Sequence, residues 1–302
     1  MSDEELTKLE TALKSKDENT VTEITINHTS TERIKLRENY KKKFKRELLD
    51  DIQKYTKSDL CKTLVSIYKD PIEYDADLLY SAMKGIGTND EILIEVISFR
   101  SFSRLTKIKQ KFKEKYGKDL ISEVKSETSG DYKTTLIALL ETERSNNKNP
   151  DLDKCKEIAE ELYKAGEGKI GTNESVFVKY FTTLSAEELS IVGKEYHLNH
   201  KKNLVSVIEN EISGDLKKLF KRILYGLLSP SEYFARQING AVKGIGTNDT
   251  QLIRSIVSRM DEDMKMIKKY YKKLFGKEMA EDIRGDTSGN YQKLLLALIG
   301  EK

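Results

Sequence analysis

Three short glycine-rich segments recur along the chain, and each is followed at one fixed distance by an acidic residue. Met83–Asp90 reads Met-Lys-Gly-Ile-Gly-Thr-Asn-Asp, Val242–Asp249 differs from it only in its first residue, and residues 168–174 are a looser copy. The last glycine of each segment precedes its acid by 40 residues, in the pairs Gly87 and Glu127, Gly171 and Glu211, and Gly246 and Asp286. A spacing that is kept three times predicts a duplicated unit in which the loop and the acid meet in space.

The chemistry that such a loop and acid could support is the binding of a hard divalent cation. Glycines at alternate positions let a loop turn so that successive carbonyl oxygens point to one side. Loop carbonyls, one bidentate carboxylate and water suit calcium, which accepts irregular oxygen ligands, better than magnesium, which prefers a strict octahedron. Because one carboxylate leaves a net positive charge, we expect weak binding by the protein alone, with a Kd on the order of 10⁻⁴–10⁻³ M.

An anionic lipid phosphate could fill the remaining positions on such an ion, so that calcium and membrane each raise the affinity for the other. The loop tips favour this interpretation, because each pairs an apolar residue with a lysine. The tip residues that we expect to contact a membrane are Lys84, Ile86, Lys169, Ile170, Lys243 and Ile245. Each isoleucine would gain about 1.5–3 kcal/mol if fully buried, and each lysine about 1 kcal/mol beside anionic lipid. Packing of the isoleucines on a neighbouring loop is the alternative.

The elements that must position these loops are helices in four units. Only three prolines occur, at positions 71, 150 and 230, and each lies where a helix should begin. They divide the chain into residues 1–70, 71–146, 147–228 and 229–302. Since no strand-like alternation competes with the helical periodicity, the fold class is all-α.

Within the second unit we predict five helices. The first runs from Pro71 to about Lys84, and the glycine loop follows. Thr88 then caps the second helix, with Glu91 completing a capping box. The third helix stops near Gly117, a short fourth helix follows, and the fifth begins after the Thr-Ser-Gly segment at 128–130. The fourth unit repeats this pattern in register.

The first unit departs from the pattern. Its loop, residues 13–17, has lost both glycines and is about two residues short, and Tyr55 stands where the acid should be. We therefore predict no calcium site of this kind in residues 1–70.

Composition narrows the remaining classes of function. Lys+Arg 53 nearly cancel Asp+Glu 50, and the net charge of +3 is too weak to hold nucleic acid or an anionic membrane by bulk attraction, so no nucleic-acid partner is expected. Two cysteines allow no disulfide framework. The chain has no apolar run of about 20 residues and no secretory signal, so the expected location is cytoplasmic and, reversibly, at membrane surfaces.

Two further clusters have simpler interpretations. His197 and His200 are spaced to share a helical face, but without a third ligand we expect a solvated pair rather than a metal site. The lysine-rich runs at 41–46 and 268–273 occupy matching places in different units, so we expect them to form the solvated face of the third helix.

Lys-Gly-x-Gly-Thr with an acid at this distance, in four units of about 70–80 residues that share a Thr-Ser-Gly motif, resembles the annexin family over the whole chain. The resemblance implies four five-helix repeats in a slightly curved disc, and reversible calcium-dependent binding to acidic phospholipid such as phosphatidylserine, without enzymatic activity. The lysine-rich composition and degenerate first unit fit a divergent member near the protist giardins. The family's N-terminal tail is nearly absent, so we expect no partner binding through a tail.

Carrying the family's ligands over by motif gives three calcium sites. The second unit resembles the family's loop with ligands at Met83, Gly85, Gly87 and Glu127. The fourth unit does so with Val242, Gly244, Gly246 and Asp286. The third unit resembles a longer variant loop, Gly-Glu-x-Lys-x-Gly-Thr, with ligands at Gly166, Lys169, Gly171 and Glu211.

Two alternatives from other classes remain. The chain could be a cytoskeleton-associated helical scaffold that binds protein partners with little dependence on calcium. An enzyme that holds phosphate in its glycine loops would need a strand before the loop and a lysine after the glycines. Here a helix precedes the loop and Lys84 and Lys243 come before the glycines, so no catalytic residue is predicted.

Overall fold

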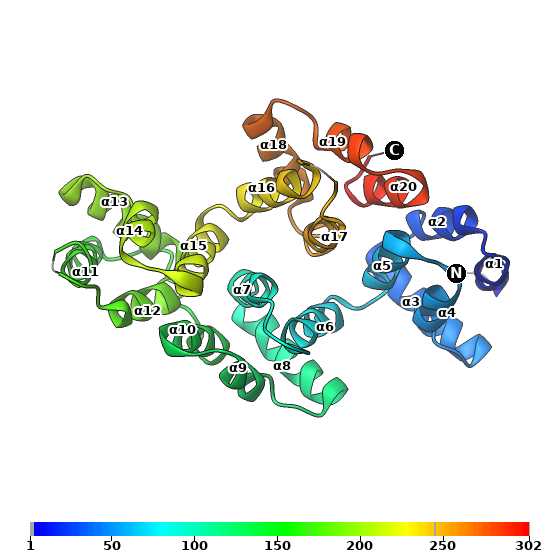
Figure 1. Ribbon diagram of the computed structural model, residues 1–302, viewed down its shortest axis with the longest axis horizontal. Coiled ribbons are helices and arrows are strands. Elements are labelled where there is room, and N and C mark those ends of the chain that lie inside the picture. Colours follow the sequence, from blue (N-terminus) through cyan, green and yellow to red (C-terminus); the bar gives the residue numbers. More distant parts are fainter. Residues whose placement is uncertain (1–2, 169, 245, 302) are drawn as a thin grey trace. The chain divides into compact units, whose positions relative to one another are not determined.

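The computed structural model describes residues 3–168, 170–244 and 246–301, and over these ranges the chain forms α-helices and no strand (Figure 1). Repeat 1 holds α1 (Asp3–Ser15), α2 (Glu18–Ile26), α3 (Ser30–Phe44), α4 (Leu48–Tyr55) and α5 (Ser58–Ile67). Repeat 2 holds α6 (Pro71–Met83), α7 (Asp90–Phe99), α8 (Phe102–Tyr116), α9 (Leu120–Glu127) and α10 (Gly130–Glu141).

Repeat 3 holds α11 (Leu152–Ala165), α12 (Glu174–Thr183), α13 (Ala186–His200), α14 (Leu204–Glu211) and α15 (Gly214–Leu228). Repeat 4 holds α16 (Pro230–Val242), α17 (Asp249–Val257), α18 (Met264–Phe275), α19 (Met279–Asp286) and α20 (Gly289–Leu298). The all-α prediction of four five-helix repeats is confirmed. None of the helices over the described ranges combines the length and the apolar character needed to cross a bilayer.

The repeats pair into two compact units that do not follow the order of the chain. Unit 1 joins repeats 1 and 4, and unit 2 joins repeats 2 and 3. In unit 1, α2 packs against α20 and α5 against α17; in unit 2, α7 packs against α15 and α10 against α12. These helices therefore bury their apolar faces partly in their own repeat and partly against a second one.

Helix ends follow the local sequence in most places. Ser101 caps α8 by accepting a hydrogen bond from the Arg104 N–H, and Gly117 ends that helix in the left-handed conformation, as predicted. Repeats 1 and 3 have no glycine at the position of Gly117, and there Lys45 and Lys201 take the left-handed conformation instead, with φ of 56° and 59°. In both places the cap N–H still donates to the carbonyl oxygen four residues earlier, although lysine disfavours this conformation.

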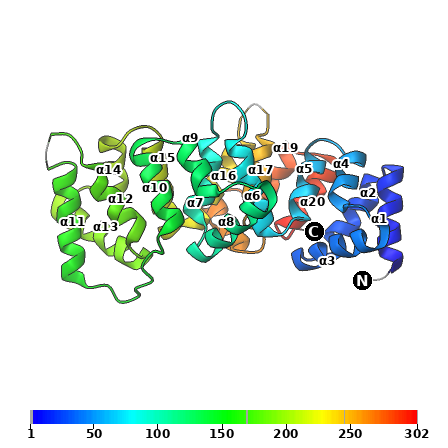
Figure 2. The ribbon, with the colours of Figure 1, turned by 90° about the horizontal axis from the view of Figure 1, so that it is seen from below.

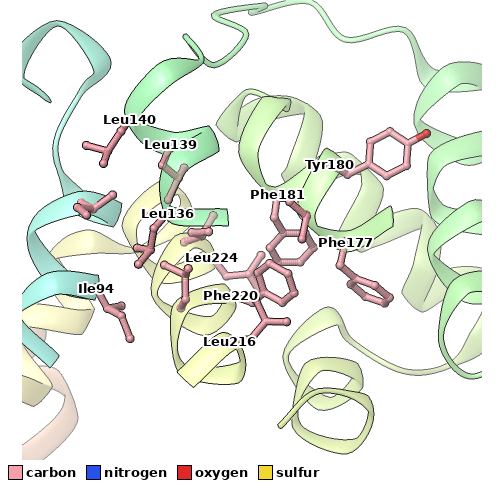
Figure 3. Packing of buried hydrophobic residues seen from close by; sticks show 14 of the residues in the cluster. Ile94, Leu136, Leu139, Leu140, Phe177, Tyr180, Phe181, Leu216, Phe220 and Leu224 are labelled. Carbon is pink, nitrogen blue, oxygen red and sulfur yellow. The ribbon is translucent and has the colours of Figure 1, made fainter. Parts of the chain in front are cut away.

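The core of unit 2 runs without interruption through both of its repeats. Figure 3 shows Leu136 and Leu140 of α10 in one buried cluster with Phe181 of α12 and Phe220 of α15, and Leu140 lies at the side away from the two rings. The rings of Phe181 and Phe220 lie 5.0 Å apart, and both side chains are fully buried. Large apolar side chains at helical spacing therefore join repeats 2 and 3 into one core.

A buried ion-pair cluster lies at the end of α7. Asp75 of α6 is fully buried and accepts two hydrogen bonds of 2.9 Å from the Arg100 guanidinium and one of 2.8 Å from Arg104. Burial alone would lower the pKa of Arg100, but the Asp75 carboxylate raises it, so Arg100 stays charged. The cluster joins the first, second and third helices of repeat 2.

The expectations for the histidines and lysine runs are partly wrong. His200 is not simply solvated, because its ring stacks on Tyr163 at 3.8 Å and its Nε2 lies 3.1 Å from the Glu160 carboxylate. Lys43 and Lys268 are half-buried and reach other helices; Lys43, for example, donates to the Asp3 carbonyl oxygen at 2.7 Å. A lysine whose stem lies along apolar surface can still bring its ammonium to a distant carbonyl.

Removing the acid of the buried cluster should be costly. We expect Asp75→Ala to lower the free energy of unfolding by about 3–5 kcal/mol, because it leaves the Arg100 charge buried without a partner. Denaturant unfolding followed by circular dichroism measures this. Lys156→Ala removes an exposed ion pair with Asp153 and should cost less than about 1 kcal/mol. Equal losses in the two variants would contradict a structural role for the cluster.

Candidate functional site: the loop and the acid

The structure brings each glycine loop against its acid through a threonine. In repeat 2 the Thr88 hydroxyl donates to Glu127 Oε2 at 2.8 Å. In repeat 3 Thr172 donates to Glu211 Oε2 at 3.0 Å, and in repeat 4 Thr247 donates to Asp286 Oδ2 at 2.6 Å. Each acid is the last residue of the fourth helix of its repeat, α9, α14 or α19. The predicted meeting of loop and acid is therefore confirmed three times.

The backbone closes each loop in the same way. The N–H of Asn89 donates to the Ala82 carbonyl oxygen at 2.8 Å, seven positions earlier in the chain. Asn248 and Ala241 form the same bond at 2.8 Å in repeat 4, and Asn173 and Ala165 form it at 2.7 Å in the longer loop of repeat 3. The end of the first helix and the start of the second are thus held together, and the residues between them form the loop.

The predicted helix cap at Thr88 is wrong. Helix α7 begins at Asp90, and its cap is Asn89, whose side-chain oxygen accepts a hydrogen bond from the Ile92 N–H. Asn248 caps α17 in the same way, through the Gln251 N–H. Threonine and asparagine both make good caps, so the sequence alone did not decide between neighbours. The consequence is that Thr88 is free to bind Glu127.

Positive φ angles are needed in these loops, and glycine supplies them. The last glycine has φ of 81° in repeat 2, 80° in repeat 3 and 81° in repeat 4. In repeat 3 another glycine, Gly168, is needed for a steric reason, because a Cβ there would lie 2.9 Å from the Tyr163 carbonyl oxygen. These backbone conformations allow successive carbonyls to face one side of the loop, as the ligand prediction requires.

The loop tips expose their apolar residues. Ile86 is 108% exposed and Ile170 is 104% exposed, so neither packs on a neighbouring loop. Figure 2 shows the loop between α6 and α7 projecting beyond the helix ends of unit 2. Lys84 is exposed, with its ammonium 5.5 Å from the Tyr80 ring, and Lys243 is exposed too. Lys169 and Ile245, named among the site residues, lie outside the described residues.

The loop of repeat 3 has an extra anchor that sequence reasoning missed. Glu167 accepts a hydrogen bond from the Tyr196 hydroxyl at 3.0 Å and forms an ion pair with Lys202, both from the α13 side of the repeat. Burial and the Glu167 carboxylate raise the pKa of Tyr196, and the same carboxylate raises the pKa of Lys202. Gly166 lies beside Glu211, since a Cβ there would be 3.5 Å from the Glu211 Cγ.

Repeat 1 keeps the backbone hydrogen bond that closes the loop but lacks the other features of the candidate site. The Asp17 N–H donates to the Ala12 carbonyl oxygen at 2.8 Å, across five residues instead of seven, and Asp17 caps α2. Tyr55 ends α4 at the place where Glu127 ends α9. Lys16 stands at the position of Thr88. Glycines, threonine and acid are therefore missing together.

The residues of the three complete sites fit a divalent cation. Among the described residues, one threonine is the only side chain that hydrogen-bonds each of Glu127, Glu211 and Asp286, so the second carboxylate oxygen is left for another ligand. No cluster of three or more histidine, cysteine or acidic side chains suited to a metal occurs over the described ranges. Any ion at these loops would take its other ligands from backbone carbonyls and from outside the protein.

Comparison with known proteins identifies the family. The annexin family model matches residues 4–67, 74–139, 157–223 and 233–298, one segment in each repeat. Annexin A7 of Dictyostelium discoideum is 38% identical over 284 residues, which cover 94% of this chain and 61% of that relative. The chain thus spans about three fifths of the length of that relative.

Solved structures that are similar to this chain point to the same family. Annexin III superposes with a TM-score of 0.94 at 30% identity, over 99% of this chain and 93% of its own. Calcium-bound annexin (Sm)1 superposes with a TM-score of 0.83 at 26% identity, over 98% of this chain and 89% of its own. This chain belongs to the annexin family, whose members generally bind calcium and phospholipids. Its placement near the giardins stays a prediction.

The reassigned cap can be tested by stability. We expect Asn89→Ala to lower the free energy of unfolding by about 1 kcal/mol, because the Ile92 N–H loses its partner. Chemical denaturation of the two single variants Asn89→Ala and Thr88→Ala measures the difference. Because Thr88→Ala also removes the hydrogen bond to Glu127, the cap is judged from Asn89→Ala alone, and unchanged stability of that variant would return the cap to Thr88.

Proposed function

We propose that this protein binds acidic phospholipid membranes, such as those containing phosphatidylserine, reversibly and in a calcium-dependent manner through the loops of repeats 2, 3 and 4. The observation that carries the proposal is the link between loop and acid, which is formed three times and is missing from repeat 1 together with its glycines. Ligation by Met83, Gly85, Gly87 and Glu127, and by the matching residues of the other two repeats, is part of this proposal.

Charge explains why the membrane is needed. One carboxylate per site neutralises half of the charge of a calcium ion, so the protein alone would hold calcium weakly. A lipid phosphate supplies both a negative charge and an oxygen ligand. Calcium binding and membrane binding are then linked, and each strengthens the other by the same factor.

The exposed tips supply the second contact. Ile86 and Ile170 are fully exposed beside their sites, where an apolar side chain gains free energy by entering the boundary between headgroups and acyl chains. Lys84 adds attraction to anionic lipid. The relatives support the same function, since annexins generally bind phospholipids and are generally not enzymes.

The mechanism can be tested with one triple variant. We expect the wild type to sediment with phosphatidylserine-containing vesicles in calcium and to be released by chelator. The variant Glu127→Ala, Glu211→Ala, Asp286→Ala should lose this binding, because each loop loses its carboxylate ligand. Co-sedimentation over a calcium titration is the measurement.

A matched control separates ligand loss from charge loss. Glu123→Ala, Glu209→Ala, Glu281→Ala removes three acids from the same helices, none of which bonds a loop threonine, and should bind like the wild type. Vesicle binding that is unchanged by calcium and by both triple substitutions would favour the alternative of a cytoskeletal scaffold. A wild type that does not bind vesicles at all would favour the same alternative.

The tips can be tested separately. We expect the double variant Ile86→Ser, Ile170→Ser to raise the calcium concentration for half-maximal vesicle binding. The loss of membrane-binding free energy should be at most about 1.5–3 kcal/mol for each isoleucine, which is the value for full burial. Calcium binding without vesicles, measured by calorimetry, should not change. Leu152→Ser, which alters an apolar residue that is 56% exposed at the start of α11, is the control and should leave vesicle binding unchanged. An unaltered calcium requirement in the isoleucine variant would show that the tips stay outside the membrane.

A further inference from the structure

Repeats 2 and 4 each have a lysine that reaches from the third helix of the repeat to the end of the fifth helix, and repeat 3 lacks this lysine. In repeat 2, Lys109 of α8 donates to the Leu140 carbonyl oxygen at the end of α10, at 2.6 Å. In repeat 4, Lys268 of α18 donates to the equivalent carbonyl of Ile299, at 3.3 Å. The matching residue of α13 is Gly193, and no side chain extends from it toward Leu224, the counterpart of Leu140.

An apolar pocket of about 870 Å³ lies at this place in repeat 3, lined by residues of α13, α14 and α15. Figure 1 labels these three helices. Its floor is formed by the buried residues Leu189, Leu204 and Leu224, with Gly193 beside them. Leu198 and Leu228 line it and remain 58% and 45% exposed. Its volume falls in the range of small-molecule sites, about 300–1,000 Å³.

The glycine at 193 is not required by the fold of the helix. A Cβ there would meet only Leu204, at 3.5 Å, which is an ordinary contact. Glycine in the middle of a helix destabilises it relative to alanine. Because repeats 2 and 4 carry lysine at this position without disturbing the same helix, the space at Gly193 is a particular property of repeat 3.

The charge around the pocket indicates what it would hold. Lys194 and His197 lie at its mouth on successive turns of α13, both exposed, and no acidic residue lines it. Lys194 has no ion-pair partner among the described residues. The corresponding pocket of repeat 4, about 550 Å³, differs in being lined by Lys265, Lys268, Lys269 and Lys272. Two of these are neutralised there, Lys268 by Glu301 and Lys272 by Glu278.

We propose that repeat 3 binds one fatty acid, with the hydrocarbon chain in this pocket and the carboxylate beside Lys194 and His197. An apolar interior with a free cation at its mouth matches an amphiphile that is apolar along its length and anionic at one end. A small anion would gain nothing from the leucine walls. A neutral hydrocarbon would leave the positive charge at the mouth without a partner.

This site is separate from the calcium loops. The residues that line it come from the last three helices of repeat 3 and the positions that cap them, and neither Glu211 nor any described residue of the loop at 166–172 is among them. Binding should therefore occur in chelator and without vesicles. The inference does not depend on the proposed membrane function, and its failure would leave that function untouched.

The test is the binding of oleate, below its micelle concentration, to the whole protein in chelator, measured by isothermal calorimetry. We expect one saturable site per chain. Gly193→Leu should weaken the affinity at least about tenfold, because the new side chain projects into the pocket and takes space that the hydrocarbon chain would use. Lys194→Gln should weaken oleate binding about two- to fivefold, as expected for an exposed ion pair, and should not weaken the binding of oleyl alcohol.

Two controls keep the result interpretable. Lys269→Gln, at the matching position of repeat 4, should bind oleate like the wild type. Leu198→Glu places a carboxylate on an exposed wall of the pocket, where it does not put folding at risk, and it should weaken oleate binding. It takes the place of Gly193→Leu as the test if that variant proves unstable. The proposal is overturned if oleate shows no saturable binding, if binding survives both Gly193→Leu and Leu198→Glu, or if Lys269→Gln weakens it as much as Lys194→Gln.

Discussion

A threonine hydroxyl that donates to a carboxylate is the contact on which the candidate sites depend. It connects a loop between the first and second helices of a repeat with the end of the fourth helix, about 40 residues later in the chain. The hydrogen bond uses one carboxylate oxygen and orients the side chain, which leaves the other oxygen for a further ligand. A surface loop acquires a defined position in this way, because its anchor is the rigid end of a helix.

The same contact explains why repeat 1 differs so thoroughly. Once the acid is replaced by Tyr55, the threonine has nothing to bind, and the glycines have no ligand geometry to support. Repeat 1 retains only the backbone bond between Asp17 and Ala12, which holds α1 against α2 and serves the fold alone. Repeat 1 thus keeps the packing contact without the residues of the candidate site.

Much of this arrangement was predictable from sequence because it rests on repetition and on helix-end chemistry. The constant spacing of glycine and acid predicted their meeting, and Gly117 predicted the end of α8. The cap at Asn89 was not predictable, since Thr88 beside it has nearly the same preference and only the position of Glu127 decides between them. The pocket at Gly193 also escaped prediction, because it arises from a lysine missing at a position whose role in the other repeats, bonding to a carbonyl of the fifth helix, is visible only in three dimensions.

The pairing of repeats 1 and 4 has a consequence for how the chain folds during synthesis. The helices of repeat 1 emerge first, yet α2 and α5 bury part of their apolar surface on α20 and α17, and Ser30 hydrogen-bonds Asp261 across a separation of 231 residues. Repeats 2 and 3 are contiguous and can complete their shared core as they leave the ribosome. Repeat 1 must wait with exposed leucine and valine side chains until repeat 4 has been added. The order of synthesis therefore makes the first repeat the last to be finished, and it is the part of the nascent chain most in need of protection from aggregation.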